Sequence, residues 1–261
     1  MKPIASVFLL TAVSLAMPSI ANASSFTTGS VTVNASDDIY AAGSQSDLVT
    51  NCGAVGYCGA GGLGTVPGGI SVTGLTYLTL TASGTITING GGQYNDPDGL
   101  SGGNPAYVTT SFSSGFGSIS GITAPGGGYL VGVFVGAGGP SGSAPASLSY
   151  TTADTEDASY NPLLDQVFFI GDGLTGDGTG ANQLFYVPTG ATELYLGISD
   201  ACSFSGGPSC YGDNTGTYSD ISYTGVTSGS GSPSPVPEPS SLMLLATGVL
   251  SAAGALRRRL A

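Results

Sequence analysis

Short runs of alternating apolar and polar residues recur through the middle of this chain, separated by glycine-rich breaks. Residues 30–35 and 75–82 follow this alternation. Because successive side chains of a strand point to opposite faces, a period of two predicts strands that are buried on one face. Residues 129–135 are apolar at almost every position, which predicts a central strand covered on both faces.

Further runs of this kind continue the series, and no segment shows a helical period. They are residues 85–88, 166–170, 183–187, 193–199 and 218–224. A series of about eight or nine short strands with turn signals between them is typical of all-β folds. We therefore expect a single β-sandwich domain over residues 24–226.

The N-terminus has the pattern of a secretory signal peptide. Lys2 precedes an apolar run over residues 4–15, and Ala21-Asn22-Ala23 forms a small-residue cleavage site. We expect residues 1–23 to be removed, so that the exported chain begins at Ser24. A retained membrane anchor is the alternative, but the apolar run is too short to span a bilayer.

A second apolar segment, residues 241–256, lies near the C-terminus and carries no charge. As a helix it would be about 24 Å long, slightly short of a hydrocarbon core of about 30 Å. Pro237 and Pro239 set its outer end, because proline cannot continue a helix. Three arginines at 257–259 follow it and should stay cytoplasmic. We predict a single transmembrane helix here.

Together these C-terminal features resemble the PEP-CTERM sorting signal of Gram-negative bacteria. The residues that carry the resemblance are Val236, Pro237, Glu238, Pro239, Arg257, Arg258 and Arg259. It implies recognition by an exosortase-type processing enzyme. The protein would first be held in the inner membrane by its C-terminal helix and then reach the cell surface or the extracellular space.

A plain single-pass anchor is the alternative interpretation of the C-terminal segment. In either case the C-terminal segment occupies residues 236–261. Residues 227–235 are rich in Gly, Ser and Pro, a composition typical of a linker between the body and such a segment.

The exported body has no cationic side chain. Residues 24–235 lack Lys, Arg and His and hold fifteen of the sixteen acidic residues, so their side-chain net charge is −15. This composition excludes nucleic-acid binding, which requires cations opposite the phosphates. Carboxylates that meet in this body must be spread apart, protonated, hydrogen-bonded by backbone N–H groups, or neutralised by a bound cation.

The missing histidine also narrows the possible chemistry. A Ser-His-Asp or Cys-His relay and a histidine-ligated zinc site cannot be built. Hard cations with oxygen ligands remain, and Ca²⁺ is the natural candidate outside the cell. We do not expect an enzyme. A glycosidase that uses two carboxylates is the alternative, but the sequence singles out no such pair.

Four cysteines occur in this exported chain, in two local pairs. An oxidising compartment favours disulfides, and local pairing predicts Cys52–Cys58 and Cys202–Cys210. A metal site built from all four thiolates is the alternative, although the sequence has no Cys-x-x-Cys spacing.

The richest group of oxygen ligands lies near the end of the body. A predicted strand ends at Asp200, and a cysteine-closed loop leads to Asp213 and Asn214. Gly212 and Gly216 permit the turns that aim main-chain carbonyls inward. Side-chain oxygens and carbonyls together build the ~6–8 ligands of a calcium site. An ordinary turn is the alternative, because Asp and Asn also bond their own backbone.

Two segments here resemble bacterial calcium-dependent galactose-binding lectins. Tyr-Leu-Gly-Ile-Ser-Asp followed by Tyr-Gly-Asp-Asn-Thr-Gly resembles the C-terminal part of these proteins, and Gly-Gly-Gln-Tyr at 91–94 resembles a strand that enters their site. The resemblance implies a lectin-like, jelly-roll type of sandwich. It implies calcium ligands at Asp200, Asp213 and Asn214 through side chains and at Tyr94 and Cys210 through carbonyls. Asp200 and Asp213 would also touch the sugar.

The chain departs from this family in three ways. The pocket histidine is missing, Asp213 replaces an asparagine, and the loop 202–210 is longer. Galactose specificity therefore does not carry over. The sequence predicts a surface or extracellular calcium-dependent carbohydrate-binding protein with a glycan or exopolysaccharide partner. The alternative is a non-catalytic structural protein of a biofilm or extracellular matrix, with at most a structural calcium.

Three other acidic segments are weaker candidates. For residues 95–99 we expect a solvated turn, with further calcium ligands as the alternative. Residues 154–157 are expected to form an exposed face. Residues 172–177 fail the EF-hand pattern, because Leu174 and Gly176 stand at ligand positions.

Overall fold

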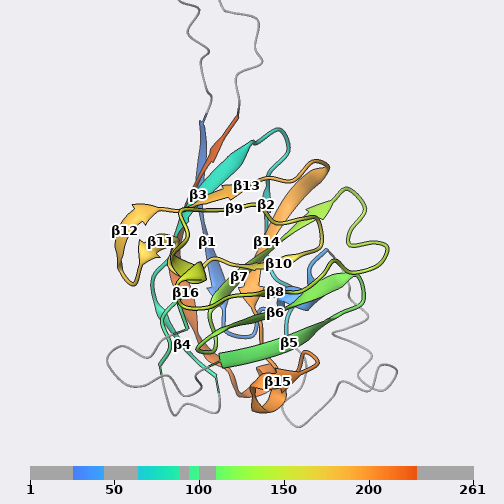
Figure 1. The fold of residues 1–261 in the computed structure, drawn as a ribbon, viewed down its shortest axis with the longest axis vertical. Helices are drawn as coiled ribbons and strands as arrows, with labels where there is room; N and C mark the ends of the chain where they lie inside the picture. Colours follow the sequence, from blue (N-terminus) through green and yellow to red (C-terminus); the bar gives the residue numbers. More distant parts are fainter. Residues whose placement is uncertain (1–25, 44–63, 89–93, 100–109, 228–261) are drawn as a thin grey trace, which may run out of the picture. The chain divides into compact units, whose positions relative to one another are not determined.

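The computed structural model describes residues 26–43, 64–88, 94–99 and 110–227. These residues belong to one compact unit, 25–228. Within them the chain forms strands in several sheets and short 3-10 helices, with no α-helix (Figure 1). The predicted all-β class is confirmed at this level.

The first sheet has six strands in the order β1-β16-β3-β13-β9, with β4 paired to β16. Its longest members, β1 and β16, run antiparallel. The strand bounds are Phe26–Asn34 (β1), Tyr77–Thr81 (β3), Thr85–Thr87 (β4), Ser159–Tyr160 (β9), Leu184–Tyr186 (β13) and Thr215–Val226 (β16).

The second sheet is central and has the order β10-β7-β14-β2. Its core is the antiparallel pair β7 and β14, in which Phe134 stands opposite Leu194 and Leu130 opposite Ile198. The strand bounds are Gly69–Ser71 (β2), Leu130–Gly136 (β7), Val167–Phe169 (β10) and Ala191–Ile198 (β14).

Strand β7 packs against a hydrophobic cluster on each of its faces. Leu130 and Phe134 join the cluster shared with the first sheet, whereas Val131, Val133 and Val135 join a second cluster. Because side chains alternate along a strand, these two sets lie on opposite faces of the sheet. The central, doubly covered strand predicted at 129–135 is therefore confirmed.

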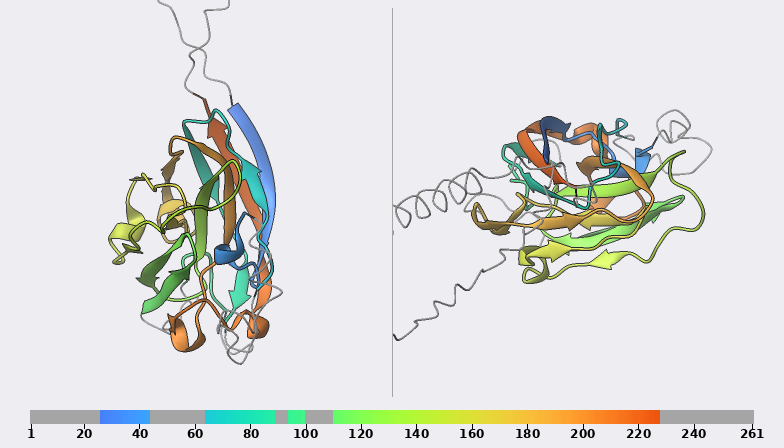
Figure 2. Two further views of the ribbon diagram at one scale, coloured as in Figure 1. Left: turned by 90° about the vertical axis from the view of Figure 1, so that its right-hand side faces the viewer. Right: turned by 90° about the horizontal axis from the view of Figure 1, so that it is seen from above.

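A third sheet covers the other face of the central sheet. Its order is β15-β5-β6-β8, and β6 contributes Ile119, Ile122 and Ala124 to the second cluster. The body thus has three sheet layers (Figure 2). The predicted β-sandwich of lectin-like, jelly-roll type stays a prediction. The bounds are Thr110–Phe116 (β5), Ile119–Pro125 (β6), Leu148–Ser149 (β8) and Ser205–Gly206 (β15).

Strand β5 explains why the third sheet was not predicted. Its inward positions include the small polar residues Ser111 and Ser113, whereas Phe112 is partly exposed. This inverts the usual alternation of a half-buried strand. The hydroxyl of Ser111 donates to the Tyr129 hydroxyl at 3.1 Å, so its burial is compensated by a hydrogen bond.

The remaining elements are a two-stranded ribbon and four 3-10 helices. The ribbon pairs β11 with β12 in antiparallel fashion. The bounds are Leu174–Gly176 (β11), Thr179–Asn182 (β12), Ile39–Ala41 (η1), Asp154–Glu156 (η2), Cys202–Phe204 (η3) and Tyr211–Asp213 (η4).

The segment around η1 lies across the end of β14. The amide of Ile198 donates to the carbonyl of Asp37 at 2.8 Å. Gly197 allows this approach, because a Cβ atom there would lie 2.7 Å from the same carbonyl oxygen. This contact places an N-terminal segment beside the loop that follows β14.

The chain enters and leaves the body at one end of the first sheet, and β16 starts at the other end. Phe26, at the start of β1, pairs with Val226, at the end of β16, so the chain enters and leaves the body at the same end (Figure 1). Thr215 starts β16 at the other end, and twelve residues make this strand about 40 Å long.

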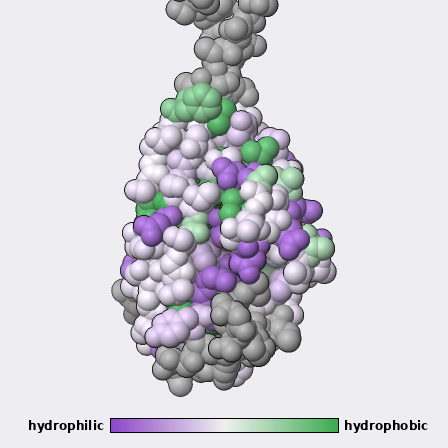
Figure 3. All heavy atoms as spheres, turned by 90° about the vertical axis from the view of Figure 1, so that its left-hand side faces the viewer, coloured by the Kyte–Doolittle hydropathy of each residue, from purple (hydrophilic) through white to green (hydrophobic). Residues whose placement is uncertain are grey.

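The molecular face in Figure 3 is mostly weakly polar, and hydrophobic residues appear on it as separate spots. The exposed large hydrophobic residues of the described ranges are likewise distributed over several elements: they are Phe26, Val66, Tyr94, Phe112, Leu163 and Tyr186. This face therefore shows no extended apolar patch of the kind that marks an interface.

Several sequence predictions lie outside the described residues. These are the signal peptide 1–23, the Cys52–Cys58 disulfide, nearly all of the linker 227–235, and the sorting signal 236–261 with its transmembrane helix 241–256. Within the ranges that the structure describes, no helix is long and apolar enough to cross a membrane.

Candidate functional site

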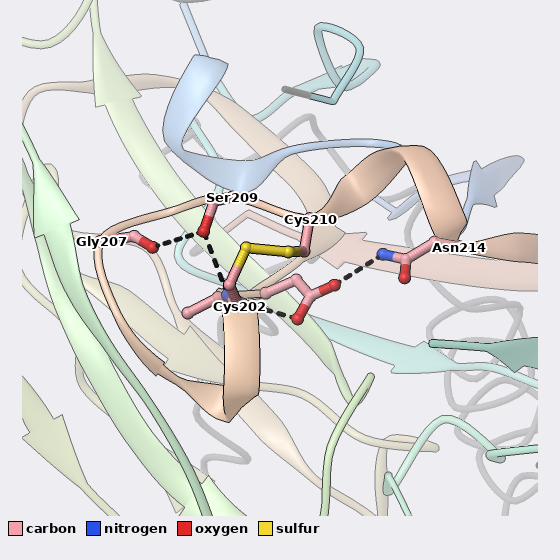
Figure 4. Close-up of a disulfide and its surroundings, with 7 residues drawn as sticks. Cys202, Gly207, Ser209, Cys210 and Asn214 are labelled. Atoms are coloured by element: carbon pink, nitrogen blue, oxygen red, sulfur yellow. Dashed lines mark hydrogen bonds between the residues drawn. A yellow bond between two sulfur atoms is a disulfide. The ribbon is translucent and has the colours of Figure 1, made fainter. Parts of the chain in front are cut away.

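A disulfide closes the loop that follows β14. Cys202 and Cys210 are bonded, with their Cα atoms 5.2 Å apart, as the sequence predicts. Inside the loop, the Ser209 hydroxyl accepts a hydrogen bond from the Cys202 amide at 3.0 Å and donates to the Gly207 carbonyl at 3.1 Å (Figure 4). These bonds give the loop a defined shape.

The structure brings Asp200 and Asn214 together across this loop. The Asn214 side-chain amide donates to one Asp200 carboxylate oxygen at 2.9 Å and to the Ala35 carbonyl at 3.1 Å. The other Asp200 oxygen accepts from the Ala201 amide at 2.7 Å. Both side chains are buried, with 7% of Asp200 and 8% of Asn214 exposed.

Asp213 and Cys210 flank this pair on the same loop. Asp213 is half-buried at the end of η4, and its charge acts on Asp200. Cys210 precedes η4 in the left-handed region, at φ 69°, which is uncommon for a residue other than glycine. Ligation by the Asp213 side chain and by the Cys210 carbonyl stays a prediction.

Tyr94 belongs to no strand and lies apart from this pair, next to strand β4. Its neighbour Asn95 bridges Ile86, and Ile86 in turn pairs with Gly216. Strand β4 therefore separates Tyr94 from β16, and the Tyr94 side chain is exposed. The role of its carbonyl as a ligand stays a prediction.

The sequence reasoning missed Asp38, which lies beside Asp200. Asp38 forms a bridge with Ile198, two residues before Asp200, and its charge acts on the Asp200 carboxyl. One Asp38 oxygen accepts from the Tyr40 amide at 2.9 Å. The residue is 1% exposed, and no local pattern around it indicates a partner so far along the chain.

Tyr211 lies between these two carboxyl groups. Its hydroxyl accepts a hydrogen bond from the Asp200 amide at 3.1 Å and donates to the Ile198 carbonyl at 3.0 Å. Burial raises the pKa of the Tyr211 phenol far above its usual range, and the charges of Asp38 and Asp200 raise it further. Tyr211 is therefore a neutral hydrogen-bonding partner.

Two buried carboxyl groups without a cationic side chain are electrostatically costly. Burial raises the pKa of Asp38 to about 7. Burial also raises the pKa of Asp200 to about 7, and the neighbouring Asp213 and Asp38 charges add to the effect. Near neutral pH this group of residues should therefore hold protons or a cation.

The oxygens at this site fit a hard cation such as Ca²⁺. Among the described residues, Oδ2 of Asp38 and Oδ1 of Asn214 are buried and have no hydrogen-bond partner. Carboxylate and amide oxygens are the ligands that Ca²⁺ prefers. The described ranges contain no group of three or more His, Cys, Asp or Glu side chains placed to hold a metal. A bound ion would therefore also need amide or main-chain oxygens.

A second acidic cluster contains Asp98 and Asp172 and lies at the start of the β11–β12 ribbon. Asp98 accepts a hydrogen bond from the Asp172 amide at 2.9 Å, and burial raises its pKa to about 7. The Asp172 carboxylate accepts from the amides of Leu174 and Gly178 at 2.8 and 2.7 Å. The Asp172 side chain thus holds the start of the ribbon, whose strand β11 spans 174–176, and Asp98 is more buried than a solvated turn would require.

A small pocket of about 50 Å³ opens beside this second cluster. Three carboxylates line it, those of Asp98, Glu156 and Asp177, together with the hydroxyls of Thr152 and Thr155. Asp154 lies in the segment 154–157, which was predicted to form an exposed face, and accepts hydrogen bonds from Thr151 at 2.7 Å.

Comparison with known proteins decides the nature of the C-terminal segment. Residues 235–259 match the family of the PEP-CTERM protein-sorting motif. The chain carries this motif. PEP-CTERM proteins are exported and sorted to the cell surface, and the motif implies processing by an exosortase.

The PEP-CTERM match covers the sorting motif and not the body. No curated protein and no solved structure matches the chain. The lectin resemblance of the body thus gains no support from these comparisons.

Proposed function

We propose that the exported body is a non-catalytic, calcium-dependent carbohydrate-binding module that is displayed at the cell surface. The observation that carries this proposal is the contact between Asp200 and Asn214 in a disulfide-closed loop, with a buried Asn214 oxygen left without a hydrogen-bond partner.

In this proposal Asp200 and Asn214 hold the ion through their side chains. Asp213 and the carbonyls of Cys210 and Tyr94 are the further ligands that the lectin resemblance implies. A bound Ca²⁺ can coordinate two neighbouring sugar hydroxyls through open positions in its shell. The half-buried Asp213 is the acid with most access to such a ligand. The chain's own residues thus position the ion and the sugar, and no bond is broken.

The position of the loop supports display. It lies at the end of the body where β16 starts, whereas the chain leaves toward the sorting motif from the end of β16 (Figure 1). The length of this strand separates the two points by about 40 Å. A ligand site at the loop would therefore lie at the end of the body opposite the end of β16.

The burial of the proposed ligands favours a second candidate function, a surface structural protein with a purely structural calcium. Asp200 and Asn214 are each less than one-tenth exposed, so an ion between them has limited access to a sugar. In this case the ion would stabilise the loop and would contact no external ligand.

A thermal scan of the full chain in detergent tests the calcium site. At a hundredfold excess over the dissociation constant, Ca²⁺ should stabilise the folded state by about 2.7 kcal/mol relative to a chelator. Asp200→Asn should lose this gain. Asp220→Asn should keep it, because Asp220 is exposed on β16. A wild-type protein with equal melting temperatures in Ca²⁺ and chelator would contradict the proposal.

A glycan array then separates the two candidate functions. Calcium-dependent binding of a glycan supports the carbohydrate-binding module. A blank array combined with calcium-dependent stabilisation supports the structural protein. Release of reducing ends from a polysaccharide would contradict both, because it would show that the protein is an enzyme.

A further inference from the structure

We infer that Asp38 joins Asp200 and Asn214 as a ligand of the same ion, so that one cation joins the N-terminal segment 37–41 to the loop 200–214. Because no group of three acidic side chains in the described ranges is placed to hold a metal, Asp38 takes the place of Asp213 in this shell. The inference rests on the calcium site of the proposed function and adds a residue that the lectin resemblance does not include.

The backbone brings the two segments together independently of any ion. The Ile198 amide donates to the Asp37 carbonyl at 2.8 Å, and the Ala35 amide donates to the Gly216 carbonyl at 3.1 Å. The Asn214 side chain also donates to the Ala35 carbonyl. The segment that carries Asp38 is therefore attached both to the strand that precedes the loop and to the strand that follows it.

The unused oxygens of Asp38 and Asn214 point to a missing partner. Each side chain is more than nine-tenths buried, and each keeps one oxygen without a hydrogen-bond partner among the described residues. The Tyr211 hydroxyl is close enough to the Asp38 carboxyl to lower its pKa, but it donates its one proton to the Ile198 carbonyl. A buried acceptor without a partner costs about 1–3 kcal/mol, and more if it is charged. A cation would satisfy both oxygens and also the charge of Asp200.

The neighbouring Asp37 does not share this feature of Asp38. One Asp37 oxygen accepts from the Asn34 amide at 2.7 Å, and the other accepts from the Thr65 hydroxyl at 2.8 Å. Asp37 is also buried, but its carboxylate is fully used by hydrogen bonds. Asp37 therefore lacks the unpartnered oxygen that Asp38 and Asn214 each have.

Close packing holds Asp38 in this position. A Cβ atom on Gly64 would lie 2.6 Å from Cβ of Asp38 and 3.0 Å from Cγ of Tyr211. The Gly64 backbone thus covers Asp38 on one side, and the Tyr211 ring lies beside it. A carboxylate enclosed in this way cannot turn out to solvent, so its charge must be neutralised where it is.

Calcium titration calorimetry on the full chain in detergent tests the role of Asp38. The wild type should bind Ca²⁺, and Asp38→Asn should weaken the affinity about tenfold or more, because charged ligands set the strength of such sites. Asp37→Asn is the matched control, and its affinity should stay within about twofold of the wild type. Asp200→Asn should also lose binding.

The outcomes separate this inference from the proposed function. If the wild type and Asp38→Asn bind equally well while Asp200→Asn does not bind, the role of Asp38 is wrong and the calcium site stands. If the wild type does not bind Ca²⁺, both are wrong. If both Asp37→Asn and Asp38→Asn weaken binding equally, the effect comes from the segment rather than the Asp38 carboxylate, and the inference is wrong.

Hydrogen–deuterium exchange of the wild type covers the case in which Asp38→Asn fails to fold. Addition of Ca²⁺ should slow amide exchange in peptides that contain residues 37–42 as well as in those that contain 200–214. Protection confined to 200–214 would overturn the inference, because an ion bound to Asp38 must also order its segment.

Discussion

The two acidic clusters of this body differ in how their carboxylates are used. Both Asp172 oxygens accept backbone hydrogen bonds. In the other cluster, Asp38 and Asn214 each keep a buried oxygen that no described residue satisfies. Acidic residues brought together by folding are therefore not evidence of a cation site by themselves. Within the described ranges, Asn95, Asp165 and Gln183 also have a buried oxygen without a partner, so what separates the candidate site from the ribbon cluster is that two such oxygens belong to the segments that meet at Asp200.

The largest expected effect is a dependence of stability on pH. Burial raises the pKa of Asp38, Asp98 and Asp200 to about 7, whereas unfolded aspartates ionise near pH 4. Between these values the folded state binds more protons, so the free energy of unfolding falls as pH rises. In chelator it should fall from pH 5 to pH 8, on the order of a few kcal/mol, as measured by urea unfolding.

Calcium should act on only one part of this pH dependence. Bound Ca²⁺ should remove the part of the pH dependence that comes from Asp38 and Asp200. The part that comes from Asp98 should remain in Ca²⁺ and should be removed by Asp98→Asn. A pH dependence that is the same with and without Ca²⁺ would show that the two clusters do not differ in the way described here.

The second prediction compares Asp200→Asn with Asp172→Asn. Asp200→Asn should abolish the calcium-induced rise in melting temperature, which we expect to be roughly 5–10 °C at a hundredfold excess of Ca²⁺. Asp172→Asn should retain this rise, because Asp172 lies in the ribbon cluster and not at the candidate site. If only Asp172→Asn lost the calcium-induced rise in melting temperature, the ion would bind at the cluster of Asp98 and Asp172 instead.

The third prediction concerns the disulfide. Replacing Cys202 and Cys210 by serine should lower the free energy of unfolding in chelator by about 2–3 kcal/mol, because a short closed loop constrains the unfolded chain. Calcium affinity should fall as well, since the loop carries the site. Urea unfolding and calcium titration of the same double variant measure both effects. An unchanged affinity would mean that the loop holds its shape without the disulfide.

The smallest effect is expected for Asp172→Asn in chelator. The wild-type Asp172 carboxylate accepts hydrogen bonds from the backbone amides of Leu174 and Gly178. The side-chain NH₂ group of the asparagine variant cannot accept a hydrogen bond, so one of the two is lost, which should cost about 1 kcal/mol. The loss should be the same with and without Ca²⁺. A loss that Ca²⁺ removes would indicate an ion near the ribbon.

Local patterns predicted the elements whose signals are contiguous in the chain. Strand β7 is apolar on both faces and lies between two sheets, and the Cys202–Cys210 disulfide closes a short loop. The third sheet was not predicted, because β5 turns Ser111 and Ser113 inward, and a hydrophobic period cannot reveal buried serines that find hydrogen-bond partners.

The candidate site also combines residues that the sequence predicts with one that it does not. Asp200 and Asn214 stand in one recognisable segment, and their contact follows from a loop that returns to its starting strand. Asp38 lies far away in sequence and reaches Asp200 only because its segment pairs with Ile198. Such a contact depends on tertiary packing, so the sequence around Asp38 gave no sign of it.

The central claim is that the unused oxygens around Asp200 bind a cation. Tyrosine-sensitised terbium luminescence tests it directly, because Tb³⁺ replaces Ca²⁺ at oxygen sites and the chain has thirteen tyrosines and no tryptophan, with Tyr211 beside the site. We predict saturable emission from the full chain that Ca²⁺ displaces and that Asp200→Asn loses. Emission that is absent from the wild type, or that persists unchanged in Asp200→Asn, would contradict the claim.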